Sequence, residues 1–104
     1  MTKTVRSCSG VLIRLTDERW SHIVEEHCEL AGHRDDILEA IADPQRVFAG
    51  TEGELLAVRP LDNRQALVVV YRETSDDDGF VITAFITTRI SALDRRRQVW
   101  PRQT

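Results

Sequence analysis

The stretch from Phe80 to Arg89 is the clearest β-strand in the sequence, and it constrains the fold more than any other segment. It is rich in the β-branched and aromatic residues that favour strands. Because side chains alternate across a strand, one face would carry three apolar side chains, Ile82, Ala84 and Ile86. The other face would mix hydroxyls, an aromatic ring and a guanidinium, on Thr83, Phe85, Thr87 and Arg89. The first face can close a core, and the second suits an anion-binding or catalytic surface.

Two helices are predicted before the strands. Apolar residues recur at three/four spacing over residues 17–30, after a possible N-cap at Thr16 and before a stop at Gly32. A second helix is predicted over residues 33–42, ended by Asp43-Pro44 because the residue before proline disfavours helical geometry. Residues 1–10 are polar and without periodicity, which predicts a frayed lead-in. Strands are predicted at residues 46–49, 54–59, 66–72 and 80–89, with a helical turn or irregular segment at 91–98.

This order predicts a single α+β domain over residues 1–104. The two N-terminal helices would pack on one face of a largely antiparallel sheet of three to four strands. Residues 66–72 (Ala-Leu-Val-Val-Val-Tyr-Arg) are apolar enough for a central strand of that sheet.

The charge balance argues against a domain whose affinity rests on a strongly basic surface, since the formal net charge is -3. The two cysteines, Cys8 and Cys28, have no metal-site spacing and predict free thiols in a reducing compartment. The first residues lack the apolar run of a signal peptide, and no segment is long and apolar enough for a membrane span. We therefore expect a cytoplasmic protein without a membrane partner.

Two histidines of the first helix are candidates for acid–base chemistry. His27 follows Trp20 by seven residues on the buried stripe, so its imidazole would point at the sheet. The alternative for His27 is a core histidine bound to a backbone carbonyl. His22 would lie on the opposite face, one turn from Glu18 and from Glu26, as a solvated residue or an alternative base.

The histidine spacing does not favour a metal site. His22 and His27 are separated by four residues, whereas zinc sites on helices favour three intervening residues. His33 would begin the second helix as a surface or capping residue. We therefore expect neither a metal nor a cofactor, and a metal-dependent hydrolase is the weakest of the possible functions.

Hydroxyl and guanidinium groups near the last strands could hold a phosphate. Thr83, Thr87 and Arg89 share one strand face, Tyr71 shares the face of Leu67 and Val69 on the preceding strand, and Arg59 ends the strand before that. Arginine offers a two-pronged donor that matches phosphate. The alternative is that the threonines are ordinary strand formers and the arginines face solvent.

Several short motifs resemble small phage and bacterial proteins of the Barnase–EndoU–colicin–RelE (BECR) nuclease-like superfamily. They are Arg19-Trp20-Ser21-His22-Ile23 followed by His27 and Glu29-Leu30, then residues 43–47, 67–70 and 80–85. There is a looser likeness to BrnT-type toxins. The resemblance covers about residues 16–89. The chain departs from the pattern at Cys28, where proline would follow the histidine, and at Phe85, where tyrosine would stand.

The resemblance implies a metal-independent endoribonuclease site on the sheet face. It would involve His22 or His27 from the helix and Thr83, Thr87 and Arg89 from the last strand. RNA would be the substrate, and an antitoxin or immunity protein would be a partner. The alternative function is a non-catalytic binding or regulatory module of the same fold. The sequence carries no indication of the oligomeric state.

Overall fold

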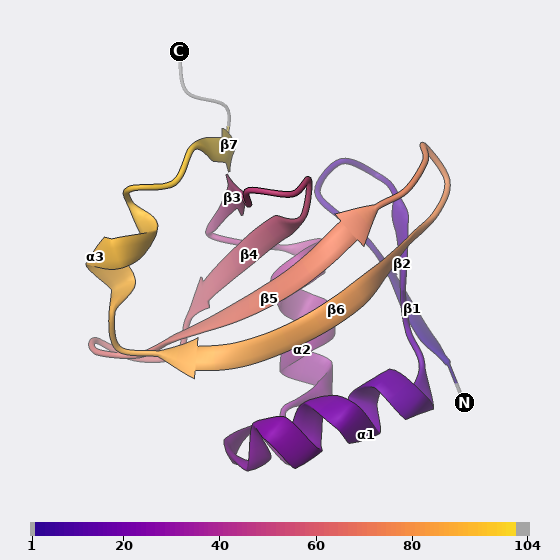
Figure 1. Ribbon diagram of the computed structural model, residues 1–104, viewed down its shortest axis with the longest axis horizontal. Coiled ribbons are helices and arrows are strands. Elements are labelled where there is room, and N and C mark those ends of the chain that lie inside the picture. Colours follow the sequence, from indigo (N-terminus) through magenta and orange to yellow (C-terminus); the bar gives the residue numbers. More distant parts are fainter. Residues whose placement is uncertain (1, 102–104) are drawn as a thin grey trace.

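The computed structural model describes residues 2–101. Its centre is a β-sheet, and two strands of that sheet come before the helices in the chain (Figure 1). In chain order the elements are β1 (Lys3–Arg6), β2 (Leu12–Leu15), α1 (Asp17–Glu26), the 3-10 helix η1 (Cys28–Leu30), α2 (Arg34–Ala42), β3 (Arg46–Ala49), β4 (Leu55–Pro60), β5 (Ala66–Glu73), β6 (Gly79–Thr87), α3 (Ile90–Leu93) and β7 (Gln98–Trp100). None of the helices within this part of the chain is long and apolar enough to cross a membrane.

The sheet has seven strands in the order β1-β2-β6-β5-β4-β3-β7. All pairings are antiparallel except that of β2 with β6, which pairs Ile13 with Gly79 and Arg14 with Phe80. The predicted α+β class is confirmed. The predicted strand number was too low, because β1, β2 and β7 have only four, four and three residues and such short strands carry little periodic signal.

The prediction of a frayed lead-in is wrong for the described part of residues 1–10. β1 pairs with β2 from Lys3 opposite Leu15 to Arg6 opposite Leu12. Ile13 and Leu15 of β2 are fully buried. Strand pairing satisfies the backbone polar groups of this polar segment, which the side-chain pattern alone could not reveal.

The first helix is shorter than predicted. The Thr16 hydroxyl accepts a hydrogen bond from the Arg19 backbone N–H at 3.1 Å, which confirms the expected N-cap. The α-helix ends at Glu26 because His27 has a non-helical backbone (φ -134°, ψ 72°), and a 3-10 turn follows. Gly32 then adopts φ +88°, a left-handed conformation that glycine reaches without strain.

Helices α1 and α2 cover one face of the sheet, as predicted, but they follow β1 and β2 and so are not N-terminal. Ile23 of α1 and Ile37 and Ile41 of α2 pack with the side of the sheet that carries Leu67, Val69 and Tyr71 of β5 and Ala84 of β6. Figure 1 shows α2 behind β5 and β6. The expected inward orientation is therefore correct for Ala84 and Ile86. It is wrong for Ile82, because the irregularity in the β5–β6 pairing brings Val81 opposite Tyr71, and Val81 takes its place in the core.

The opposite face of the sheet is covered at one end only. A smaller cluster gathers Phe48, Leu56, Val58, Ala66 and Val68 under Leu93 of α3. Figure 1 places α3 beside this end of the sheet, far from α1. On β6, Thr83, Phe85 and Thr87 lie opposite Val70, Val68 and Ala66 respectively, and so belong to this second face.

Candidate functional site

A cleft lies between α1 and the outer edge of β6. Beyond Phe80 this edge of β6 has no strand neighbour among residues 2–101, and α1 runs beside it (Figure 1). The cleft measures about 310 Å³. It is lined by two histidines together with charged, polar and apolar side chains, namely Arg19, His22, Ile23, Glu26, His27, Ile82 and Thr83.

Helical spacing explains why these residues meet. Along α1, Arg19 and Glu26 are each three or four residues away from both His22 and Ile23. This spacing brings the four side chains to one side of the helix. Ile23 anchors the stripe, since it is buried in the core. The strand contributes Thr83 and Ile82 next to an irregularity in the pairing of β5 with β6, between Val70 and Tyr71. Such a bulge re-aims the side chains around it.

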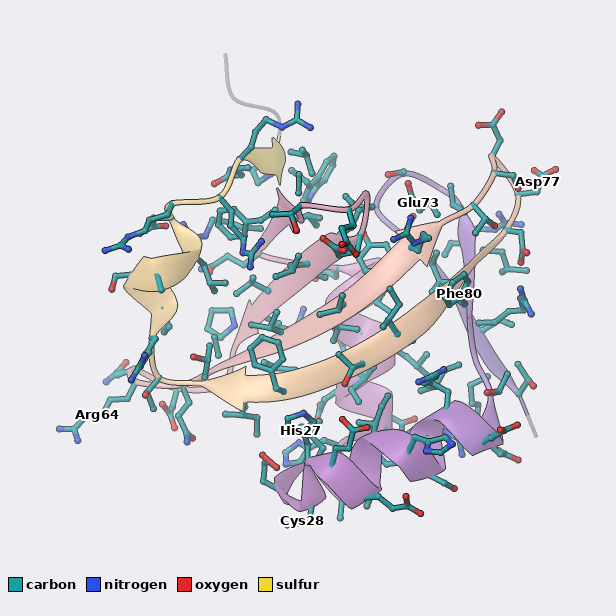
Figure 2. The ribbon with its side chains drawn as sticks, viewed as in Figure 1. His27, Cys28, Arg64, Glu73, Asp77 and Phe80 are labelled. Carbon is teal, nitrogen blue, oxygen red and sulfur yellow. The ribbon has the colours of Figure 1, made fainter. Side chains whose placement is uncertain are left out.

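His27 follows the last residue of α1 and faces β6 (Figure 2). The predicted buried stripe does not extend to it, because the α-helix ends at Glu26 and Cys28 and Ala31 are exposed. Its side chain is 32% exposed. The imidazole Nδ1 lies 3.8 Å from the Glu29 carboxylate, and the ring lies against Phe85 with the two centroids 6.3 Å apart. His27 is thus accessible from the cleft.

His22 lines the same cleft, so the expectation that it lies on the opposite face of the helix from His27 is corrected. The two residues are five positions apart, but α1 ends between them at Glu26, so His27 no longer follows the helical spacing. Both side chains therefore reach the same cleft. The His22 side chain is 53% exposed, with Nδ1 4.0 Å from the Glu25 carboxylate. His33 lies elsewhere, with Nδ1 2.8 Å from Asp36.

Thr87 ends β6 and does not line the cleft. Arg89 does not line it either, and the prediction that it shares a strand face with the threonines is wrong, because the strand ends at Thr87 and Arg89 caps α3. The Thr87 hydroxyl accepts a hydrogen bond from the Arg89 backbone N–H at 3.0 Å, in the turn that leads to α3. The Arg89 side chain is exposed. Thr83 and Thr87 share the sheet face away from α2, as expected, but Thr83 alone of the two reaches the histidines.

The structure does not bring Arg59 and Tyr71 together with these groups. Arg59 pairs with Leu67 in the register, so it projects to the helix-covered side of the sheet. There its guanidinium donates to the Asp43 backbone carbonyl at 2.6 Å and approaches the Glu39 carboxylate at 3.4 Å. Tyr71 is on the same side and is fully buried.

Two cleft residues, Arg19 and Glu26, were not among the predicted site residues. Their signal was present in the sequence, because Arg19 precedes His22 by three positions and Glu26 follows it by four. The sequence does not show which stripe of the helix faces a strand edge, and that is a matter of tertiary packing.

The donor set does not form a metal centre. Within residues 2–101 there is no group of three or more His, Cys, Asp or Glu side chains close enough to hold a metal ion. Cys8 and Cys28 are both free thiols. Comparison with known proteins finds no family model, no curated protein and no solved structure that matches the chain.

Proposed function

We propose that the chain cleaves RNA without a metal ion, at the cleft between α1 and β6. The observation that carries the proposal is that His22, His27, Arg19 and Thr83 line one cleft. Cleavage of RNA through its own 2′-hydroxyl needs a base, an acid and a cation that stabilises the charge developing on the phosphate. Two imidazoles and a guanidinium supply these three functions. The resemblance to BECR nucleases supports the same chemistry.

In this mechanism one histidine removes the proton of the 2′-hydroxyl while its oxygen attacks the adjacent phosphorus. The bond from phosphorus to the 5′ oxygen of the next nucleotide breaks, and the other histidine protonates that leaving oxygen. His27 is the general base, because its ring lies between the Glu29 carboxylate and the Phe85 ring at the end of α1, beside β6. His22 is the acid. Arg19 binds the phosphate, and Thr83 donates a hydrogen bond to it. Arg89, just beyond the end of β6, contacts the RNA chain.

The test is cleavage of a mixed RNA substrate by purified protein in EDTA. Wild type should cleave it, and His27→Ala should lower the rate by a factor of about 10² to 10⁴. His33→Ala is the matched control, because His33 is outside the cleft and bound to Asp36. The mechanism is ruled out by absence of cleavage of any RNA, or by equal rates for wild type and His27→Ala.

A second candidate function is a non-catalytic binding or regulatory module. The acidic groups around the cleft favour it, since Glu26 lines the cleft and Glu25 and Glu29 lie beside the two histidines. Carboxylates repel an RNA backbone and attract a basic partner. A protein that fails to cleave RNA but forms a salt-sensitive complex with a basic protein would support this function.

If the chain is a toxin, it requires an antitoxin or immunity protein that covers the α1–β6 cleft. Growth arrest on expression of wild type, relieved by a neighbouring reading frame, would support that arrangement. Growth arrest by His27→Ala at the wild-type level would separate toxicity from the proposed chemistry.

A further inference from the structure

A second hollow lies at the other end of the sheet and shares no lining residue with the α1–β6 cleft. It measures about 480 Å³, within the range of small-molecule sites. The β1–β2 loop, the β3–β4 turn, the end of β5 and β7 surround it. Its lining includes four side chains that can hydrogen-bond or carry charge, Cys8, Glu54, Tyr71 and Glu73. Figure 2 shows Glu73 at the end of β5, away from His27.

Within residues 2–101, two carboxylates of this hollow have no cationic partner. Glu54 and Glu73 are both partly buried, and among the described residues neither forms an ion pair. Glu73 accepts a hydrogen bond from the Ser7 hydroxyl at 2.6 Å. Glu54 accepts one from the Glu52 backbone N–H at 3.2 Å. Partly buried charges are usually compensated by a counter-charge, so this pair attracts a cation.

The Tyr71 hydroxyl, in a residue that lines the same hollow, is buried and lacks a hydrogen bond of good geometry among residues 2–101. Tyr71 is fully buried, and its hydroxyl interacts with the Cys8 thiol but makes no hydrogen bond of good geometry within residues 2–101. Burial raises the pKa of Tyr71, so the phenol is protonated at neutral pH. A buried polar group without a hydrogen bond is costly, and such groups point to an unmet partner. Tyr71 lines the hollow together with Cys8 and Glu73.

The remaining wall suits an organic ligand. Val47, Leu55 and Val99 provide apolar surface, and the Trp100 side chain, 40% exposed, provides an indole face. An indole attracts a cation placed over its ring. Arg97 is exposed at the rim and pairs with neither carboxylate.

We propose that this hollow binds a small organic cation, of the amidinium, guanidinium or primary ammonium class. The Glu54 and Glu73 carboxylates accept its N–H donors, Trp100 stacks on its apolar part, and the Tyr71 hydroxyl supplies a further hydrogen bond. An organic cation fits better than a metal ion, because the described chain has no cluster of three or more metal-ligating side chains. The proposal stands independently of RNA cleavage, since the two sites have no residue in common.

The test is titration of the full chain with benzamidine, followed by two-dimensional amide and indole NMR. Benzamide is the matched probe, because it has nearly the same shape without the charge. Benzamidine should shift the signals of Trp100, Tyr71 and Glu73, and benzamide should bind at least about tenfold more weakly. Equal binding of the two probes, or no shift at a benzamidine concentration of about 10 mM, would overturn the proposal.

Two variants test whether the Glu73 and Glu54 carboxylates bind benzamidine. Glu73→Gln keeps the size of the side chain and an acceptor for Ser7, so it should fold and should weaken benzamidine binding at least about tenfold. Gly50→Ala is the second variant, because a methyl group there collides with the Glu54 side chain and displaces it from the hollow. Glu18→Gln, an exposed change on α1, should leave the titration unchanged. Wild-type affinity in a folded Glu73→Gln protein would show that the carboxylates do not recognise the ligand.

Discussion

The His27 imidazole lies against the Phe85 ring, with the ring centroids 6.3 Å apart and the planes tilted by 40°. This contact joins the residue that ends α1 to the sheet face that is not covered by α2. Because His27 has left the helical backbone, the position of its ring depends on this neighbour as well as on α1. Phe85 is therefore a positioning residue for His27.

Replacing Phe85 with alanine should lower the rate constant for RNA cleavage about tenfold or more while KM changes little, since the imidazole loses its support but the phosphate contacts stay. Phe85→Tyr should keep the rate, because it keeps the ring. A fall in stability with an unchanged rate would show that Phe85 is only a core residue.

Arg19 and Arg59 should behave differently when each is replaced with alanine. Arg19 lines the cleft, so Arg19→Ala should reduce cleavage at least about tenfold. Arg59 binds the Asp43 carbonyl on the helix-covered side, so Arg59→Ala should cost about 1 kcal/mol of unfolding free energy and leave the cleavage rate unchanged. Cleavage rates compared at equal concentrations of folded protein check the prediction for each variant. Loss of cleavage in Arg59→Ala alone would restore Arg59 as a phosphate ligand.

Stability should decline in alkaline solution because of the buried Tyr71 and the partly buried Cys8. Burial raises the pKa of Tyr71 above its ordinary value of 10.0 and that of Cys8 above 9.0. The folded state therefore keeps protons that the unfolded chain releases, so stability is full below about pH 9 and falls as pH rises. Each group contributes a slope of up to about 1.4 kcal/mol per pH unit.

Urea unfolding from about pH 7 to about pH 11 measures this slope. Tyr71 is the sole tyrosine and Lys3 the sole lysine in the sequence, so few other groups titrate in that range. The double variant Cys8→Ala/Tyr71→Phe should flatten the curve. An identical alkaline decline in wild type and double variant would contradict the assignment.

Alanine substitutions at two leucines should differ in their effect on the unfolding free energy, because one leucine is buried in the core and the other is exposed. Leu67 of β5 is fully buried beneath the helices, so Leu67→Ala should lower the unfolding free energy by about 2–5 kcal/mol. Leu61, in the turn before β5, is 37% exposed, and Leu61→Ala should change it by less than about 0.5 kcal/mol. Chemical denaturation of both variants gives the comparison, and similar losses would contradict the placement of β5 at the centre of the sheet.

The start of α1 depends on the Thr16 hydroxyl, which accepts from the Arg19 backbone N–H. Thr16→Ala should cost about 1 kcal/mol of unfolding free energy, and Thr16→Ser should cost much less because it keeps the oxygen acceptor. Thermal unfolding of the two variants measures the difference. Equal melting temperatures would mean that the cap does not stabilise the helix that carries the cleft residues.

The sequence alone determined the class of the fold and the inward faces of its main elements. The alternation over residues 80–87 predicted that Ala84 faces the helices and Thr83 faces away from them, and both are correct. The apolar run at residues 66–72 predicted a central strand, and β5 has neighbours on both sides. These features are local, because the periods of strands and helices are properties of the chain itself.

Only the tertiary structure decided which residues share a surface. It placed β1 against β2, ended α1 at Glu26, brought His22 and His27 to one cleft, and turned Arg59 to the helix-covered side of the sheet. It also gathered Glu54, Tyr71 and Glu73 around a hollow that no spacing in the sequence indicates. Strand order, register and helix position depend on contacts between distant segments, and a local pattern of side chains carries no information about those contacts.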